Sequence, residues 1–194
     1  MKRLIAVDGL DGCGKDSHAS AIRRLLEERG EEVVLMTHPS TRIIGRLSKR
    51  FLQQTGTVPR FLATVFFTLD VLASVSRYKR QRHGTVIFVR YLLGAAYLPP
   101  RLARRGYIFF RKLLPFPDLP LFIDIQPEKA IRRIDERDHR REMFETLSKL
   151  REIRLVTLRI VDDDWRVVDN TEDGDGPFMV TERITKSVYK YLIN

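Results

Sequence analysis

The stretch Gly9-Leu10-Asp11-Gly12-Cys13-Gly14-Lys15-Asp16-Ser17 decides the fold of this chain. It follows an apolar run at residues 4–7, typical of a buried strand, and precedes residues 18–29, where apolar side chains recur at helical spacing. Glycines in such a strand–loop–helix context let backbone N–H groups converge on phosphate oxygens, and the helix start adds positive potential. Lys15 can then reach the terminal phosphates as a point charge. The stretch therefore predicts a phosphate-binding loop.

Outward from this loop, short β-branched runs alternate with longer helical stretches. Strands are expected at 4–7, 32–36, 85–89, 121–125 and 165–168, and helices at 18–29, 41–54, 61–75, 127–137, 141–161 and 177–192. The basic segment between residues 89 and 121 contains five prolines and is predicted to be an irregular connection, and residues 171–177 a mobile loop. This order predicts one α/β domain over residues 1–194, a P-loop NTPase-type three-layer sandwich with a five-stranded parallel sheet and helices on both faces.

Composition narrows the class of protein. The 194 residues are 43% hydrophobic and 31% charged, which is typical of a soluble globular domain. Cys13 is the single cysteine of the sequence, so an internal disulfide framework and a multi-cysteine metal site are excluded. No apolar run approaches the roughly 18 residues of a membrane span. We therefore expect a cytoplasmic protein that has no membrane partner.

Positive charge is concentrated in three segments. The net charge is +10, and residues 42–60, 77–83 and 101–112 carry basic residues without any acidic one. Such clusters indicate either a polyanionic partner or a solvated basic face. The segments contain no recognisable nucleic-acid motif, and apolar residues interrupt the basic runs. The sequence therefore favours a solvated face over nucleic-acid binding.

Asp16 departs from the usual phosphate-loop pattern, which has serine or threonine after the lysine as a hydroxyl ligand for Mg²⁺. A carboxylate is a stronger oxygen ligand for Mg²⁺, but it repels phosphate by about 4 kcal/mol per charge pair at 4 Å and an effective dielectric of 20. One hypothesis makes Asp16 a Mg²⁺ ligand that ties nucleotide binding to the metal. The other gives the hydroxyl role to Ser17 and makes Asp16 a favourable negative charge at the helix start. The sequence leaves both open.

Further motifs accompany the loop in a fixed order. They are Gly9–Lys15, His38-Pro39-Ser40-Thr41-Arg42, Phe66–Asp70, Val89-Arg90-Tyr91, Gly94–Tyr97, Pro117-Asp118-Leu119, Pro127-Glu128, Arg133–Arg137 and Met143-Phe144-Glu145. In this order and spacing the chain resembles the thymidylate kinase family of nucleoside monophosphate kinases over most of its length.

The resemblance implies an activity and a set of partners. The expected reaction is transfer of the γ-phosphoryl group of ATP, with Mg²⁺, to a nucleoside monophosphate, most simply dTMP giving dTDP. A small-molecule nucleotide is the expected partner, and family members are usually homodimers. Two alternatives remain: a kinase of another phosphate-bearing acceptor, and a catalytically weakened, nucleotide-dependent nucleic-acid-binding protein.

The same resemblance implies roles for individual residues. ATP would bind at Gly9, Asp11, Gly12, Cys13, Gly14, Lys15, Asp16, Ser17 and Arg133. Catalysis would rest on Lys15, Arg90, Arg137 and Arg141, the last two in a lid at about residues 133–145, where arginine stabilises charge on the transferring group. The acceptor would bind at Asp11, Arg42, Phe67, Arg90, Tyr91 and Tyr97, with Phe67 stacked on the base and Arg42 and Arg90 on its phosphate.

Two further positions depart from the family pattern. Val89 occupies the place of an aspartate that precedes Arg90 in the family, and Val71 that of an arginine that contacts the pyrimidine. A carboxylate absent at Val89 and present at Asp16 suggests compensation across the site. The loss of a donor at Val71 weakens the expectation of thymine specificity, because an apolar pocket cannot restore that discrimination.

Overall fold

A computed structural model of the chain describes residues 2–136 and 142–170, together with residues 182–184, 186, 188 and 190. Five strands form one parallel sheet in the order β2-β3-β1-β4-β5. The strands are β1 (Lys2–Gly9), β2 (Val33–Thr37), β3 (Gly84–Val89), β4 (Leu119–Asp124) and β5 (Arg166–Asp169). The predicted sheet is confirmed, and each expected strand lies within a few residues of its observed bounds.

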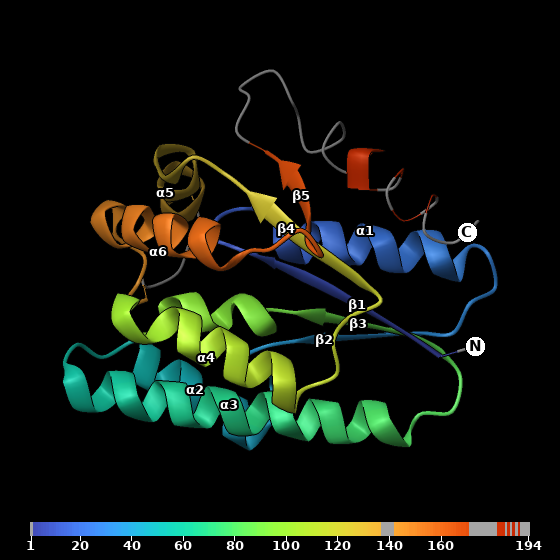
Figure 1. The fold of residues 1–194 in the computed structure, drawn as a ribbon, viewed down its shortest axis with the longest axis horizontal. Coiled ribbons are helices and arrows are strands. Elements are labelled where there is room, and N and C mark those ends of the chain that lie inside the picture. Colours follow the sequence, from blue (N-terminus) through green and yellow to red (C-terminus); the bar gives the residue numbers. More distant parts are fainter. Residues whose placement is uncertain are drawn as a thin grey trace.

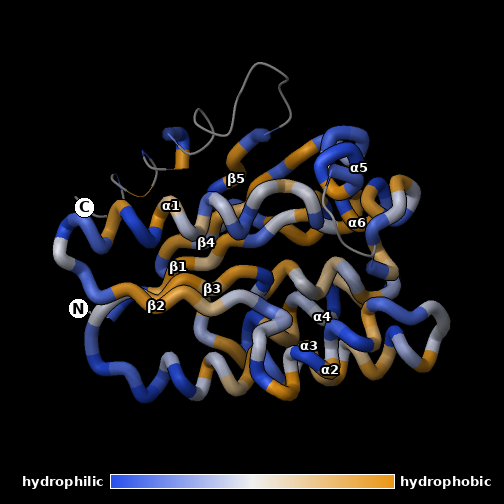
Figure 2. The backbone as a smooth tube through the Cα atoms, turned by 180° about the vertical axis from the view of Figure 1, so that it is seen from behind, coloured by the Kyte–Doolittle hydropathy of each residue, from blue (hydrophilic) through white to orange (hydrophobic). Residues whose placement is uncertain are grey.

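Helices connect the strands and cover the sheet. They are α1 (Lys15–Glu27), α2 (Ile43–Leu52), α3 (Thr57–Arg80), the 3₁₀ helix η1 (Leu92–Tyr97), α4 (Pro100–Leu113), α5 (Pro127–Asp135) and α6 (Leu147–Ile160). Seen from behind, the hydrophobic strands run through the middle of the molecule, with α1 on one side and α2, α3 and α4 on the other (Figure 2). The α/β class predicted from the alternation of elements is therefore confirmed.

The segment between β3 and β4 is more regular than its prolines predicted. The expectation of an irregular connection is wrong, because η1 and α4 occupy most of it. Pro100 is the first residue of α4, a position where the missing N–H costs nothing and the fixed φ suits the helix. The remaining prolines flank α4 and do not interrupt it. The predicted loop at 171–177 lies outside the described residues.

Helix α3 is the longest helix of the described chain, and in Figure 1 it lies beneath α4. Its length and composition alone would allow it to cross a membrane. The same helix packs along α2 and contains Asp70, a fully buried acid that is ion-paired with Arg42. Apolar core helices of globular domains share that composition. Here α3 is thus an integral part of the folded domain.

The register of the sheet places the chemistry at one edge. Val7 of β1 lies beside Val89 of β3, and Gly9 lies beside Ile123 of β4. Because parallel strands end at the same edge, the loop after β1 and the turn after β3 meet there. The interior strands are almost fully buried on both faces, so their ends form a rigid base for the loops.

Candidate active site

The phosphate-binding loop joins the central strand to α1. Gly14 precedes the first turn of α1 with φ 84°, and Gly12 has φ 83°. A Cβ atom on Gly12 would lie 2.4 Å from the carbonyl oxygen of Ala130. Glycine is thus required at residue 12 both by the left-handed backbone and by the approach of α5. No side chain caps the start of α1, which leaves its first amides directed at the loop.

A buried carboxylate organises the charges in this loop. Asp11 pairs through Oδ1 with the Nζ of Lys15 at 3.1 Å and with the guanidinium of Arg90, and the hydroxyl of Tyr97 donates to its Oδ2 at 3.1 Å. The Nζ of Lys15 also donates to the carbonyl of Leu10 at 2.9 Å. Two cations from different parts of the fold therefore converge on one acid at the mouth of the loop.

Electrostatics fix the protonation states of this group. Burial raises the pKa of Asp11, but Arg90 and Lys15 lower it by more, and the net result is a pKa well below the ordinary value. Burial lowers the pKa of Arg90 and the Asp11 charge raises it, with a net rise. Burial also raises the pKa of Tyr97 well above its usual range. At neutral pH Asp11 is therefore a carboxylate, Arg90 a cation and Tyr97 a neutral phenol.

A second buried acid holds the turn that follows β3. Asp8 accepts the backbone N–H of Tyr91 at 2.7 Å and that of Leu93 at 3.2 Å. Burial raises the pKa of Asp8 to about 6, although these two hydrogen bonds lower it in part. Arg90, at the start of this turn, has φ 59°, a left-handed conformation that side chains other than glycine rarely adopt. Asp8 therefore ties the turn that carries Arg90 to the central strand.

A cavity lies beside the loop. Asp11 and Arg90 together form one part of the cavity lining. The other lining residues are mainly apolar side chains of α2, α3 and η1. Phe67 and Tyr97 line it, as do Asp8, Pro39, Ser48, Leu52, Ala63, Thr64, Leu93, Leu98, Glu142, Phe144, Ile153 and Thr157. A mainly apolar cavity with a few convergent polar groups at one part suits a ligand with a flat base and a charged tail.

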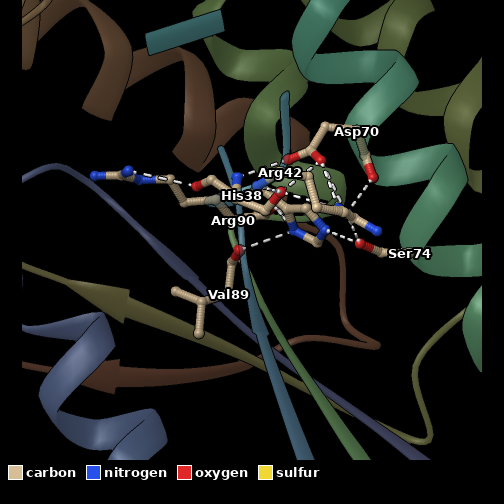
Figure 3. Close-up of polar contacts among 7 residues, drawn as sticks. His38, Arg42, Asp70, Ser74, Val89 and Arg90 are labelled. Atoms are coloured by element: carbon tan, nitrogen blue, oxygen red, sulfur yellow. Dashed lines mark hydrogen bonds and ion pairs between the residues drawn. The ribbon is translucent and has the colours of Figure 1, made fainter. Parts of the chain in front are cut away.

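Two residues expected at the acceptor lie elsewhere. Arg42 is held on the far side of the turn, where its guanidinium pairs with Asp70 at 2.8 Å (Figure 3). Tyr91 donates its hydroxyl to the carbonyl of Pro115 at 3.0 Å and lines a smaller neighbouring cavity together with Val71. The structure thus brings Asp11, Phe67, Arg90 and Tyr97 together and leaves Arg42 and Tyr91 outside the main cavity. Their roles toward the acceptor stay predictions.

The lid is described only in part. Arg133 lies half-buried on α5, whereas Arg137 and Arg141 lie outside the described residues. Beyond them, Phe144 packs edge-on against Tyr97, with ring centroids 5.2 Å apart. Burial raises the pKa of Glu142, which lines the cavity near Arg90. Phe144, at the end of the segment predicted to be a lid, therefore contacts Tyr97 in the lining of the cavity.

The remaining residues singled out in the sequence lie in the loop, in the first turn of α1 and in β3. Asp16 and Ser17 are exposed in the first turn of α1, and Val89 is fully buried. Cys13 is fully buried, and burial raises the pKa of its thiol, so its side chain stays neutral. The carbonyl of Cys13 accepts a hydrogen bond from Asn170 at 3.0 Å. Cys13 therefore contributes its backbone to the loop.

Several residues of the site were not found by sequence reasoning. Asp8, His38, Asp70, Ser74 and Glu142 surround Arg90 and its turn. Asp70 carried a signal that could have found it, because it is the single acid in the apolar stretch 57–80. A lone carboxylate in such a helix needs a buried partner. His38 and Ser74 carried no comparable signal, since their contacts depend on packing between distant segments.

The loop at the end of the central strand and the arginine in the turn after the neighbouring strand define a P-loop phosphotransferase. The model of the family described as thymidylate kinase matches residues 7–175. A probable thymidylate kinase of Pyrobaculum aerophilum is 32% identical over 175 residues, covering 86% of this chain and 87% of that protein. A probable thymidylate kinase of Archaeoglobus fulgidus is 28% identical, covering 97% and 96% of the two chains. This chain belongs to the thymidylate kinase family.

A solved structure supports the fold assignment. The thymidylate kinase of Candida albicans superposes with a TM-score of 0.78 at 21% identity, covering 97% of this chain and 92% of that one. The family and the enzyme class inferred from the motifs are confirmed. Neither alternative function, another acceptor or nucleic-acid binding, is favoured by these matches.

Asp8 gives a testable pH dependence. Its pKa of about 6 exceeds the value of 3.8 expected in the unfolded chain, so the folded state favours the protonated form. The contribution of Asp8 to the free energy of unfolding therefore falls as pH rises from about 4 to 6, by about 3 kcal/mol. Between pH 4 and 7 the free energy of urea unfolding of the native protein, taken relative to that of Asp8→Asn so that the opposite contributions of His18 and His38 cancel, should show this fall. The exposed Asp163→Asn should keep it, and equal slopes in Asp8→Asn and the native protein would contradict the assignment.

Proposed function

We propose that the protein transfers the γ-phosphoryl group of ATP to dTMP, giving dTDP and ADP. The observation that carries this proposal is the convergence of Lys15 and Arg90 on Asp11, which lines the cavity together with Arg90. Lys15 belongs to the phosphate loop, and Arg90 to the wall of the cavity. Family membership supports ATP as the phosphate donor and dTMP as the acceptor.

Each group then has a physical task. The loop amides and Lys15 bind the phosphates of ATP, and Arg90 faces the phosphate of the acceptor. Asp11 keeps both cations in place before the nucleotides arrive, so little reorganisation is needed during transfer. Phe67 offers a flat apolar surface to the base, and Tyr97 covers the sugar side of the cavity. Arg133, Arg137 and Arg141 would add positive charge as the lid closes. The reaction proceeds by positioning and charge neutralisation.

Lys15→Met tests this function. We expect turnover of dTMP with ATP to fall at least about 100-fold, because the variant loses the charge that stabilises the transferring group. A coupled assay of ADP release measures it, with all nucleoside monophosphates as acceptors. Lys112→Met, on the exposed face of α4, is the matched control and should behave as the native protein. Unchanged turnover in Lys15→Met, or preference for another monophosphate, would contradict the proposal.

The donor set at the loop fits Mg²⁺. The described residues contain no cluster of three or more acidic, histidine or cysteine ligands, but Mg²⁺ is usually held by one or two carboxylates together with phosphates and water. Asp16 is exposed beside the loop and available for this task, whereas both oxygens of Asp8 already accept backbone N–H groups. When bound, the metal would neutralise phosphate charge. We propose that Asp16 supplies its protein ligand and compensates for the apolar Val89.

Replacing the carboxylate of Asp16 should weaken the dependence of ADP binding on Mg²⁺. In Asp16→Asn, ADP should bind more tightly than in the native protein without Mg²⁺, because a repulsive charge is gone, and gain less from added Mg²⁺. Calorimetric titration of ADP with and without Mg²⁺ measures both. Ser17→Ala separates the alternative, in which the serine hydroxyl is the ligand. The same Mg²⁺ dependence in Asp16→Asn and the native protein would exclude Asp16.

We also propose that the protein is a homodimer that associates through α3. Val58 and Phe61 are 67% and 66% exposed, and Leu69 is 44% exposed further along the same helix. Large apolar side chains that gather on one exposed face typically mark a protein–protein contact. The side of α3 that carries them is therefore the proposed interface.

Phe61→Asp tests the dimer. Analytical ultracentrifugation should show twice the chain mass of 22.7 kDa for the native protein and the chain mass for the variant. Phe109→Asp, at an equally exposed position on α4, is the control and should remain dimeric. A monomeric native protein, or a dimeric Phe61→Asp variant, would contradict the proposal.

A further inference from the structure

Arg90 holds an unfavourable backbone conformation that the surrounding structure must stabilise. Among the described residues it is the one residue other than glycine with positive φ. Such a conformation persists only where neighbouring groups over-determine it. Asp8 binds the N–H groups that follow Arg90, but it does not contact the carbonyl groups of Val89 and Arg90. Those two carbonyl groups therefore need another partner.

His38 is that partner. Its Nδ1 lies 3.1 Å from the carbonyl oxygen of Val89 and 3.1 Å from that of Arg90 (Figure 3). The backbone N–H of His38 donates to the carbonyl oxygen of Val89 at 3.0 Å. The carbonyl oxygen of His38 accepts from the guanidinium of Arg90 at 3.4 Å. A single residue thus contacts the backbone of the turn and the side chain that the turn presents.

The contacts of the ring determine its tautomer. Carbonyl oxygens only accept hydrogen bonds, so Nδ1 must carry the proton. On the other side of the ring, Nε2 lies 2.8 Å from the hydroxyl of Ser74. That hydroxyl oxygen already receives an N–H from Arg42, so its own proton is available to Nε2. The ring is therefore neutral, with a proton on Nδ1 and an acceptor at Nε2.

Arg42 is itself fixed by a buried acid. Asp70 is fully buried and accepts from the guanidinium of Arg42, and it also accepts the N–H of Ser40 at 2.6 Å and its hydroxyl at 2.7 Å. Burial lowers the pKa of His38 to about 4, with a smaller opposing effect from Asp70. A continuous chain of hydrogen bonds thus runs from Asp70 through Arg42, Ser74 and His38 to the backbone of Arg90.

We propose that His38 is a positioning residue that holds the backbone of Arg90 so that its guanidinium faces Asp11 and the cavity, with Asp70, Arg42 and Ser74 selecting the tautomer. This inference rests on the proposed function of Arg90 in phosphoryl transfer. It also assigns a task to Arg42 outside the main cavity: orienting Ser74, and through it the imidazole.

If His38 acted only by packing against its neighbours, its variants would behave differently. The ring of His38 also packs edge-on against Phe88 and Phe67, with centroids 5.5 and 6.3 Å away. A leucine would keep much of this apolar packing but cannot donate to the two carbonyl groups. An asparagine would lose the packing but can place an amide N–H near the position of Nδ1. Leucine and asparagine variants therefore separate packing from positioning.

The experiment compares His38→Leu, His38→Asn and His38→Gln in steady-state phosphorylation of dTMP. We expect kcat to fall at least about 30-fold in His38→Leu with the KM for ATP unchanged, and to remain within about fivefold of native in His38→Asn. His38→Gln, whose amide reaches toward Ser74, should rescue less than His38→Asn. Circular dichroism checks that each variant is folded. Equal kcat in the leucine and asparagine variants would overturn the inference.

A spectroscopic measurement on the native protein tests the inference independently of the kinetics of these variants. Nitrogen-15 spectra of histidine-labelled protein, assigned with His38→Asn, should show a neutral ring protonated at Nδ1 at pH 7. A ring protonated at Nε2, or a charged imidazolium, would overturn the inference even if dTMP is turned over normally. If the native protein does not phosphorylate dTMP, the proposed function fails, while the tautomer still reports on the positioning contact.

Discussion

The site depends on the ion pairs that the buried carboxylate of Asp11 makes with Lys15 and Arg90. This carboxylate sits in a loop that must remain close to α5 and the end of β1, and it neutralises two cations that would otherwise repel each other. Breaking such a pair strands an uncompensated charge in the interior, which is strongly destabilising. Because Lys15 comes from the start of α1 and Arg90 from the turn after β3, the same contact joins the helix to that turn. The same two ion pairs therefore fix the shape of the loop and the charges beside it.

The turn after β3, which carries Arg90, is constrained as well. Arg90 faces Asp11 from a backbone in the left-handed conformation, which costs on the order of 1–3 kcal/mol. The chain offsets this cost from two directions: Asp8 binds the amides that follow, and His38 binds the carbonyl groups that precede and include Arg90. Local strain at one residue therefore explains why several buried polar groups gather around it.

The sequence was sufficient to predict the fold and the position of the phosphate-binding loop. Gly9–Lys15 and the alternation of apolar runs predict a parallel sheet with the loop on its central strand, since both signals are local. Sequence reasoning was wrong about α4, where Pro100 begins a helix and does not break one. It also could not anticipate that Arg42 would be bound by Asp70, because 28 residues separate them and only the packing of α3 brings them together. Contacts of this kind become visible only in three dimensions.

The central claim is that Lys15 and Arg90 are held on Asp11 in readiness for the phosphates of two nucleotides. A crystal structure with a non-hydrolysable ATP analogue and dTMP bound together tests it most directly. The account predicts that the Nζ of Lys15 lies within hydrogen-bond distance of the ATP phosphates and that the guanidinium of Arg90 contacts the dTMP phosphate. Nucleotides bound with their phosphates away from residues 9–17, or with Arg90 facing only solvent, would contradict it.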